Sequence, residues 1–546
     1  MKKITLTLVI CFVIASTFAQ TTGRLENLKD ASGTTYNYVG EIKNKQPNGV
    51  GVAIYNNGTI IRYAGNFVDG QFNGKGVEFF SNGTFLSGEW RNGKLNGKGA
   101  SLNKDGDIYV GEFVDGKKEG RGRFVYNDKS ILCGNLKNDS YEGRCIYIVS
   151  SGMTIADNIY ADGKKNGTGY QYELDSKKLY EGTWANGDWV TSGTASYASF
   201  LKNEKFYSEK TDDQILMGSI DRTNKNLLQD TAFFYNFKNY HRYFGYYDKG
   251  FLADGIIVGD STRFFGKMDD NGAYGPGSLY KIKKYYDEGN YKNDFMDGSN
   301  NLSIDLDRKT VYYGNTDNGA LTGKAYYINN YNEIFVGDFD KGQFTGKGYV
   351  VYNTGKTVKG NFNNYELTTL TSFTDKNGAV IDLKPKSFEQ ALNLVAGELS
   401  NDLVVFKTKD NIDNVSDDYY SAKKSIVNFP GSIGSNFVFE DNDFYQGYQA
   451  DFYKGKNFQA AKAQYDKLCK DIAASNLHLK NSVSPAKLVG TIEKANEAAS
   501  TRTKFTLSNS GLSGYNIYAA LKYKDGGYTV SLVAGDVEYN DDQAKD

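Results

Sequence analysis

The chain has 546 residues, of which 61 are glycine and only 5 are proline, and its formal net charge at pH 7 is −1. Glycine therefore exceeds its usual share of roughly 7% while proline is far below its usual ~5%, and an aromatic content of 14% argues against intrinsic disorder. The near-zero charge provides no basic footprint for nucleic acid, and two histidines, His241 and His478, leave little for histidine-based catalysis.

Residues 1–19 have the pattern of a secretory signal peptide. A short basic start precedes a mostly apolar run over residues 4–18, and Ala19 completes a small-x-small cleavage site before Gln20. The apolar run is too short for a comfortable membrane span; a buried N-terminal helix is the alternative. We therefore expect an exported chain that resides in the periplasm, at the cell surface or outside the cell.

Three cysteines follow this segment, and export makes a disulfide possible. Cys133 and Cys145 are the only close pair, and the third is Cys469. Their spacing matches no zinc ligand set. Three ordinary thiols and one bridge between Cys133 and Cys145 are both compatible with the sequence.

A repeat of about 23 residues is the main feature of the chain. An aromatic-x-Gly element places glycines at positions 40, 65, 88, 111 and 134, and less regularly at 182, 218, 245, 266, 289, 314, 337 and 360. A period kept over this length identifies a repeat array of about fourteen units. We expect repeats over residues 36–195 and 241–370, separated by an irregular insertion or degenerate repeat over residues 196–240.

Each repeat is predicted to be one β-hairpin. In the clearest copy the residues alternate with period two, which places Tyr109, Gly111 and Phe113 on one face of a strand. Glycine between two rings lets neighbouring hairpins close over the backbone and share a core. A two-residue turn, in which glycine supplies positive φ, is expected at Asp69-Gly70, Asn92-Gly93, Asp115-Gly116 and Lys341-Gly342.

These residues closely resemble the MORN repeat, whose pattern reads Tyr-Glu-Gly-Glu-Trp, a turn, then Gly-x-Gly. One close copy here is Tyr180-Glu181-Gly182-Thr183-Trp184. The resemblance implies a mainly β fold, an elongated single-layer solenoid of antiparallel hairpins. At ~4.8 Å per strand, fourteen hairpins would make a ribbon on the order of 130 Å long. It also implies scaffolding, dimerisation or lipid contact rather than an enzyme, although cytoplasmic lipid roles transfer poorly to an exported chain.

Beyond residue 375 the glycine period ends, and a compact α+β domain is expected over residues 380–540. Ser387 begins a capping box, Asn457 can cap a second helix, and Ser484-Pro485 is predicted to open a third. A hairpin is expected near the end, over residues 515–534. The apolar faces of the first two helices comprise Phe388, Ala391, Leu392, Val395 and Leu399, and Ala461, Tyr465, Leu468 and Ile472.

No motif for chemistry is present, so we assign no catalytic, cofactor-binding or metal-binding residue. The sequence lacks G-x-S-x-G, a P-loop, H-E-x-x-H and paired metal-binding cysteines. The repeat aromatics are the remaining candidates, because sugars or apolar segments of a partner can stack on rings exposed along a concave wall. Most of these rings are expected to be core. The candidates are Tyr63, Phe67, Trp90, Tyr109, Phe113, Tyr180, Trp184, Phe335 and Phe339.

Three functions stay open at this point. A non-enzymatic, exported scaffold that binds protein or cell-envelope partners comes first, because no acid, base, nucleophile or metal set can be assembled. A module that binds glycans or envelope polysaccharide is the alternative, since choline- and glucan-binding wall proteins are similar in using short aromatic-Gly hairpins. An enzyme with its active site in the C-terminal domain is the third. We expect no nucleic-acid partner and no membrane-spanning segment, whereas contact with a membrane surface and a homodimer stay open.

Overall fold

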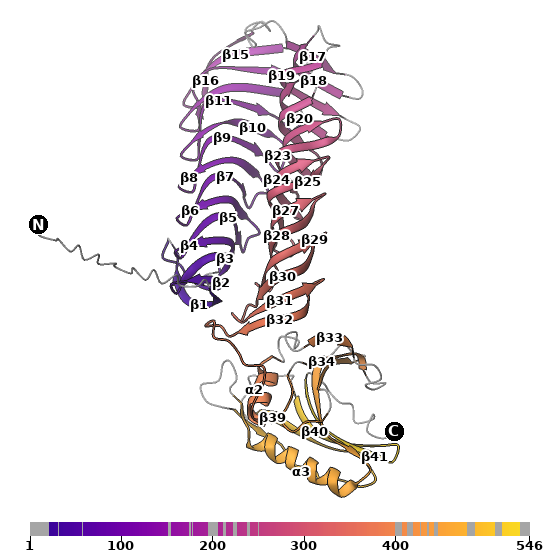
Figure 1. Cartoon of the computed structure of the whole chain (residues 1–546). Coiled ribbons are helices and arrows are strands. Elements are labelled where there is room, and N and C mark those ends of the chain that lie inside the picture. The colour runs from indigo at the N-terminus through magenta and orange to yellow at the C-terminus, as the bar shows by residue number, and fades with distance from the viewer. Residues whose placement is uncertain are drawn as a thin grey trace, which may run out of the picture. The chain divides into compact units, whose positions relative to one another are not determined.

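The structure is a computed structural model, and it divides into two compact units (Figure 1). The first comprises Met1–Gly342, Val350–Thr357 and Lys376–Gly378, and the second comprises Gln343–Tyr349, Val358–Asp375 and Ala379–Asp546. The described residues are 21–30, 32–56, 58–150, 154–173, 176, 178–194, 206–210, 214–221, 227–236, 241–248, 251–398, 407–411, 419–425, 427–433, 436–441, 446–477, 486–507 and 516–535.

The repeats form two 16-stranded antiparallel sheets, each with its strands in chain order, except that β13 and β25 each pair only with the strand before them. The first sheet contains β1 (Thr21–Lys29), β2 (Thr35–Lys43), β3 (Gln46–Tyr55), β4 (Ile60–Val68), β5 (Gln71–Phe80), β6 (Phe85–Arg91), β7 (Lys94–Leu102), β8 (Ile108–Val114), β9 (Lys117–Val125), β10 (Ile131–Lys137), β11 (Ser140–Ile148), β12 (Thr154–Ala161), β13 (Lys164–Lys165), β14 (Gly167–Glu173), β15 (Lys178–Ala185) and β16 (Asp188–Thr194). The second contains β17 (Phe206–Lys210), β18 (Gln214–Asp221), β19 (Leu227–Asn236), β20 (His241–Asp248), β21 (Phe251–Val258), β22 (Thr262–Asp269), β23 (Gly272–Lys281), β24 (Tyr285–Lys292), β25 (Phe295–Met296), β26 (Gly298–Asp305), β27 (Thr310–Asp317), β28 (Ala320–Ile328), β29 (Ile334–Asp340), β30 (Gln343–Val351), β31 (Thr357–Asn363) and β32 (Glu366–Thr374).

A row of glycines crosses the first sheet from β2 to β10. A Cβ on Gly65 would lie 2.5 Å from the Cα of Gly76, and a Cβ on Gly76 would lie 2.2 Å from the hydroxyl oxygen of Tyr63. Glycine is therefore required because backbones and rings approach too closely for any side chain, which confirms the predicted packing. The cross-strand partners along the row are Gly40, Gly51, Gly65, Gly76, Gly88, Gly99, Gly111, Gly122 and Gly134.

The rings beside this row form one core that is shared between hairpins. Tyr63 on β4 stacks on Phe72 of β5 with ring centroids 3.7 Å apart, and it meets Trp90 of β6 edge-on at 5.2 Å. Such contacts add to the burial of the rings themselves. The buried members of this ring core are Tyr36, Tyr38, Ile42, Ala53, Tyr55, Tyr63, Phe67, Phe72, Trp90, Leu95, Tyr109, Phe113 and Leu136.

The hairpin turns also have the predicted geometry. Both central residues have positive φ in all four predicted turns. These turns are Asp69-Gly70, Asn92-Gly93, Asp115-Gly116 and Lys341-Gly342. This is the type I′ conformation, whose twist matches that of the flanking strands. The Gly93 N–H donates to the Phe72 carbonyl at 3.0 Å, so a turn is also tied to the hairpin before it.

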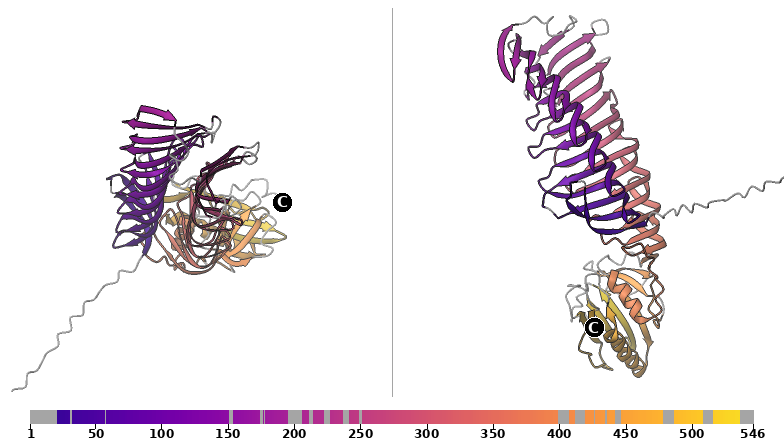
Figure 2. Two further views of the ribbon diagram at one scale, coloured as in Figure 1. Left: turned by 90° about the horizontal axis from the view of Figure 1, so that it is seen from above. Right: turned by 90° about the vertical axis from the view of Figure 1, so that its left-hand side faces the viewer.

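The predicted array of antiparallel hairpins is confirmed. Its two sheets also face each other, an arrangement that was not predicted from the sequence. Nη1 of buried Arg62 donates to the Asn329 carbonyl at 2.9 Å, and the Phe85 ring lies 5.4 Å from the Tyr286 ring. Lys129 pairs with Asp260 at 2.5 Å. Because the second partner's number falls as the first rises, the second sheet runs back along the first (Figures 1 and 2).

The reason for this arrangement lies on the strand faces that point away from the ring core. Val39, Ala64, Val77 and Ala100 are fully buried there, although they alternate with the ring positions. A sheet with a second apolar face must cover it with another layer. The repeat period describes neighbours within a sheet and contains no information about this second layer.

Three strands of the second sheet fall in the segment that was expected to be irregular, at Phe206–Lys210, Gln214–Asp221 and Leu227–Asn236. They are β17, β18 and β19, in which Gly218 pairs with Ala232 and Ala232 pairs with Gly245. This continues the small-residue row into β20. The described strands of this segment thus continue the repeat sheet, while residues 196–205, 211–213, 222–226 and 237–240 lie outside the described residues.

The C-terminal domain contains two described helices, α2 (Phe388–Glu398) and α3 (Phe458–Ala474). Its nine-stranded sheet has the order β33-β34-β35-β36-β41-β40-β39-β38-β37. Helix α3 packs on this sheet, where the Tyr465 hydroxyl lies 2.7 Å from that of Thr503. The strands are β33 (Lys407–Asn411), β34 (Tyr419–Ser425), β35 (Phe437–Asp441), β36 (Gln446–Gly455), β37 (Asn476–Leu477), β38 (Ala486–Val489), β39 (Thr501–Leu507), β40 (Asn516–Lys524) and β41 (Gly527–Gly535).

Two of the three predicted helices are confirmed, and the third is wrong. The Ser387 hydroxyl accepts from the Gln390 N–H at 3.2 Å, and the Asn457 side chain accepts from the Ala460 N–H at 3.0 Å, so both caps form as expected. The residues after Ser484-Pro485 form strand β38 instead. Leu488 is buried as this strand pairs with β39, so sheet pairing overrides the local helix-start signal. The predicted hairpin is β40 and β41.

We expect the mature chain to contain three thiols and no disulfide. Cys145 is the cross-strand partner of Gly134, whereas Cys133 is the residue before Gly134 and therefore points to the opposite face of the sheet. Burial also raises the pKa of the Cys133 thiol to about 12, which keeps it unreactive. Titration of the unfolded, unreduced chain with a thiol reagent should count Cys133, Cys145 and Cys469; a count of one would contradict the structure.

We expect the repeats to lose stability as pH rises, because two of their carboxyl groups are buried. Burial raises the pKa of Glu78 and of Asp287 to about 7, whereas an unfolded carboxyl titrates near ~4. The folded state therefore binds more protons between these values, and stability falls from about pH 4.5 to pH 7. Urea unfolding at pH 5 and pH 7.5 gives the difference in the free energy of unfolding between the two pH values. This difference should be smaller in the Glu78→Gln/Asp287→Asn variant than in the wild-type chain. An unchanged difference would exclude these two groups as its source.

Candidate binding cleft between the repeat sheets

The structure buries seven of the nine aromatic residues that the sequence offered as contacts. Each is at most 5% exposed, and five of them belong to the ring core that the hairpins of the first sheet share. A ring without an exposed face cannot stack on a ligand, so these seven are core residues. They are Tyr63, Phe67, Trp90, Tyr109, Phe113, Trp184 and Phe339.

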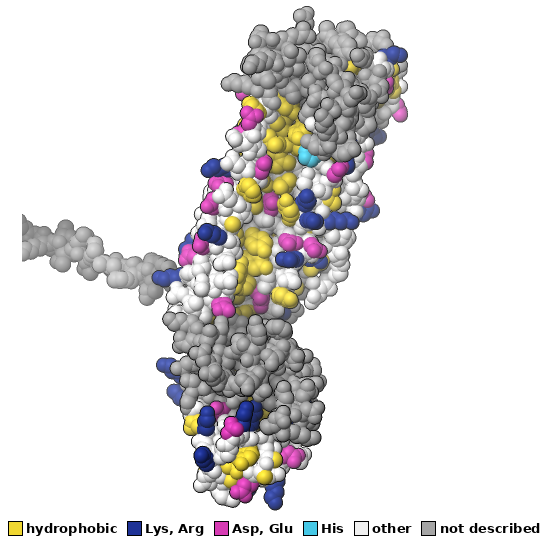
Figure 3. Space-filling view, turned by 90° about the vertical axis from the view of Figure 1, so that its right-hand side faces the viewer, with side chains coloured by type: hydrophobic (Ala, Val, Ile, Leu, Met, Phe, Trp, Pro, Cys, Tyr) yellow, Lys and Arg dark blue, Asp and Glu magenta, His cyan; other side chains and the backbone are white. Residues whose placement is uncertain are grey.

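The other two candidates, Tyr180 on β15 and Phe335 on β29, are half-buried. The Phe335 ring stacks on Tyr327 at 5.6 Å, and Tyr327 stacks on Tyr312 at 4.6 Å. Ring faces in this ladder are therefore taken up by other rings. Figure 3 shows hydrophobic side chains in a stripe along one side of the repeat region, with charged residues beside it.

A cleft between the two sheets, which we call the inter-sheet cleft, is a feature of the repeat region that can hold a ligand. Its volume is about 570 Å³, within the usual range of ligand sites. Both rows of glycines contribute to its lining, through Gly99, Gly111 and Gly122 of the first sheet and Gly266, Gly277 and Gly289 of the second.

Charged side chains from both sheets reach this cleft because they alternate with the ring positions. Glu112 lies between Gly111 and Phe113 and so points away from the ring core. The strand register shifts directly after Gly111, and a bulge of this kind re-aims side chains. Five cations and three carboxylates line the cleft: Lys75, Lys98, Arg121, Arg123, Lys267, Glu112, Asp254 and Glu288.

Two ion pairs connect the sheets across the cleft. Lys75 pairs with Glu288, and their side chains are only 17% and 15% exposed. Arg123 pairs with Asp254 at 2.5 Å. Low exposure strengthens the attraction between such charges and raises the cost of removing one partner. These pairs therefore hold the two walls of the cleft in position.

Three exposed cations in the cleft remain without a carboxylate. No carboxylate of the described residues lies within 4.0 Å of Lys98, Arg121 or Lys267. Glu112 is the cross-strand partner of Lys98, but its carboxylate lies over Gly120, where an added Cβ would be 2.4 Å from it. The cleft therefore presents net positive charge to solvent.

These cations were not predicted from the sequence, although a periodic signal marks them. Successive copies of the second hairpin strand contain Gly-Lys-Gly, Gly-Lys-Gly, Gly-Arg-Gly and Gly-Arg-Cys, which puts Lys75, Lys98, Arg121 and Arg144 at intervals of 23 residues. We call these four residues the basic column. The rings were proposed as contacts because they define the repeat. The basic column lies on the opposite face of the sheet, which the rings do not occupy.

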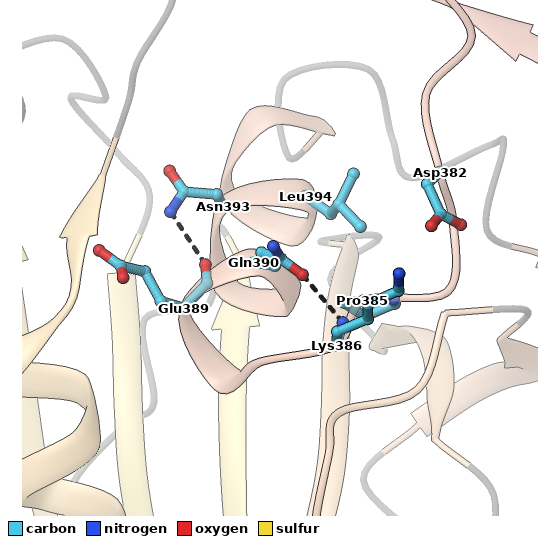
Figure 4. A pocket seen from close by; sticks show the side chains of 7 residues that line it. All are labelled: Asp382, Pro385, Lys386, Glu389, Gln390, Asn393 and Leu394. Carbon is cyan, nitrogen blue, oxygen red and sulfur yellow. Dashed lines mark hydrogen bonds between the residues drawn. The ribbon is translucent and has the colours of Figure 1, made fainter.

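A second pocket lies beside helix α2 in the C-terminal domain and has a volume of about 590 Å³ (Figure 4). Several of its polar groups are engaged in hydrogen bonds, both near in sequence and to the backbone of Asn476. The Lys386 N–H donates to Gln390 at 2.9 Å, and Asn393 donates to the Glu389 carbonyl at 2.9 Å. The seven residues that line it include no histidine, cysteine or serine: they are Asp382, Pro385, Lys386, Glu389, Gln390, Asn393 and Leu394.

Among the described residues, no group of three or more His, Cys, Asp or Glu side chains could hold a metal ion. The helices of the described segments include none that is long and apolar enough to cross a membrane.

Comparison with known proteins identifies the repeat. The MORN repeat family matches residues 38–60, 63–85, 87–108 and 109–131, which extend from β2 to the start of β10. No curated protein matches the chain. Among solved structures, "KlHsv2 with loop 6CD replaced by a Gly-Ser linker" is similar at 9% identity and a TM-score of 0.10, over 65% of this chain and 92% of that one, which is too low to support any argument. Residues 38–131 of the chain are therefore MORN repeats.

Proposed function

We propose that the mature chain is an exported, non-enzymatic scaffold that holds a protein partner in the inter-sheet cleft. MORN repeats point to a repeat scaffold or a binding role. The cleft is the observation that supports the proposal most, because both sheets line it and no carboxylate of the described residues lies within 4.0 Å of three of its exposed cations. Sites of this size and form are where proteins usually hold ligands.

The non-enzymatic part of the proposal is supported by the chemistry of the two pockets. Catalysis needs a base, nucleophile or metal within reach of one another. The inter-sheet cleft offers paired or exposed charges, and the pocket beside α2 offers amides and carboxyls that form hydrogen bonds with backbone groups. Hydrolytic activity in the intact mature chain would contradict this part.

Export is supported by the position of the first strand. Strand β1 begins at Thr21, so cleavage after Ala19 would leave all described strands intact. We expect the chain recovered from an envelope or secreted fraction to begin at Gln20. A chain that retains Met1 in its functional compartment would contradict export by this signal.

Blocking the cleft tests the binding function. Ser299 is exposed and lines the cleft, so Ser299→Trp should fill it, while Ser176→Trp places the same ring on an exposed turn outside it. Envelope fractions should yield a protein partner with the wild-type chain and with Ser176→Trp, and at least tenfold less with Ser299→Trp. Equal capture by all three would contradict the proposal.

A glycan array run with the same three proteins tests the alternative function. Saturable glycan binding that is lost in Ser299→Trp would replace a protein by a polysaccharide as the partner. Trp90→Ala and Trp184→Ala are unsuitable for this test, because both rings are core residues and their loss would destabilise the repeats.

A further inference from the structure

We infer that the inter-sheet cleft binds an acidic, extended segment of a partner protein, whose carboxylates contact the basic column. This inference rests on the proposed function and specifies the chemistry of the partner. It starts from the exposed cations Lys98 and Arg121 of the column and from Lys267 on the opposite wall, none of which has a carboxylate of the described residues within 4.0 Å.

The spacing of the column selects an extended peptide. Lys75, Lys98 and Arg121 each precede a member of the glycine row and lie on β5, β7 and β9, so successive cations are two strands apart. Two strand spacings amount to ~9.6 Å. A polyproline II segment advances ~3.1 Å per residue with three residues per turn, so carboxylates at every third residue lie about 9.3 Å apart on one side. The spacing of the cations in the basic column therefore matches the spacing of the carboxylates on such a peptide.

The lining of the cleft favours a peptide over a carbohydrate. Sugars are held by flat contact with aromatic faces, but the two aromatic side chains of the described residues that line the cleft, Phe265 and Tyr286, are 2% and 0% exposed. The exposed groups are instead charges and small polar side chains such as Asn290 and Ser299, which can bond to a peptide backbone. Lys75 is already paired with Glu288, so Lys98 and Arg121 are the cations available to a ligand.

Titration of the mature chain with a labelled peptide tests this inference. The probe is a fluorescein-labelled 15-residue peptide with Glu at every third position and Pro, Ser or Gln between. A second peptide has the same composition with its Glu residues adjacent. Fluorescence anisotropy should show at least fivefold tighter binding of the periodic peptide, and binding that weakens with salt.

Two matched double variants locate the contact. Lys98→Gln/Arg121→Gln removes two charges from the column and should weaken binding at least tenfold. Lys94→Gln/Lys117→Gln removes two charges from the exposed starts of the same strands, β7 and β9, and should change it less than twofold. Circular dichroism and thermal unfolding confirm that both variants are folded.

Three results would overturn the inference. Equal losses in the two variants would mean non-specific attraction. A uronate oligosaccharide that binds in a Lys98- and Arg121-dependent way, where the peptide does not, would make the ligand an acidic glycan. Absence of peptide binding, together with a partner that is still excluded by Ser299→Trp, would leave the proposed function standing and remove the acidic segment; loss of both would remove the proposed function as well.

Discussion

Gly65→Ala should lower the free energy of unfolding of the repeat region by about 3 kcal/mol or more. Gly65 has φ +157°, and a Cβ there would lie 2.5 Å from the Cα of Gly76 and 2.6 Å from the Lys75 carbonyl oxygen. Both obstacles are backbone atoms held in the strand ladder, so no side-chain rotation can relieve the clash. The methyl group must therefore separate β4 from β5, and the Tyr63 ring packed over this pair loses its site.

Gly193→Ala is the matched control for this variant. Gly193 lies in strand β16 of the same sheet, and an added Cβ would have no heavy atom within 4 Å. Urea unfolding followed by circular dichroism should place the control within about 0.5 kcal/mol of the wild-type chain. Equal stability of the two variants would mean that the glycine row is a matter of composition and not of packing.

Glu288→Gln should destabilise the repeat region by about 3 kcal/mol, because it leaves the ammonium group of Lys75 largely buried without its charge partner. Both side chains are less than one-fifth exposed, so solvent screens the pair only weakly. The neighbouring Glu89 lies 3.8 Å from Lys75 but is half exposed, and it can compensate only in part. The loss should appear in unfolding by urea at constant pH.

Two further variants separate charge pairing from packing. Lys324→Gln breaks a pair with Asp338 in which the lysine is 74% exposed, and such surface pairs contribute about 0–1 kcal/mol. The double variant Lys75→Met/Glu288→Leu replaces the buried pair by apolar groups and should recover most of the stability that Glu288→Gln loses. A double variant that is as unstable as Glu288→Gln would show that the charges are not the cause.

The hairpins could be predicted from the sequence because their determinants are local. The alternation around Gly111, the turn at Asp115-Gly116 and the ring-and-glycine packing all lie within one repeat or its immediate neighbour. The same holds for the helix caps at Ser387 and Asn457, which depend on residues three positions away. The MORN match over residues 38–131 agrees with the part of the array where these signals are most regular.

The second layer could not be predicted in this way. The contacts between Phe85 and Tyr286 and between Arg62 and Asn329 join residues that are about two hundred or more positions apart. Buried Val39 and Ala64 are small apolar residues that also suit a strand surface, so they did not reveal a covering sheet. The helix predicted after Ser484 was wrong for a similar reason, because pairing of β38 with β39 decides the conformation there.

The candidate site, too, could be predicted only in part from the sequence. The rings that define the repeat, such as Trp90 and Phe113, were predicted as possible ligand contacts, but regular packing of rings against glycine buries them. The cations Lys98 and Arg121 recur with the same period and remain exposed. Their positions in the second hairpin strand can be read from the sequence, whereas the wall opposite them, with Lys267, depends on the return of the second sheet.

A zero-length cross-link tests the central claim that the two repeat sheets face each other. Carbodiimide treatment of the native chain should join the Lys129 amine to the Asp260 carboxylate, which lie 2.5 Å apart, and mass spectrometry should detect the linked peptides at low protein concentration as an intramolecular product. If the hairpins continued as one single-layer ribbon that did not turn back on itself, the same residues would be about ten strands apart, on the order of 50 Å. Recovery of this cross-link supports the doubled ribbon and its cleft; its absence, with cross-links confined to neighbouring hairpins, would contradict both.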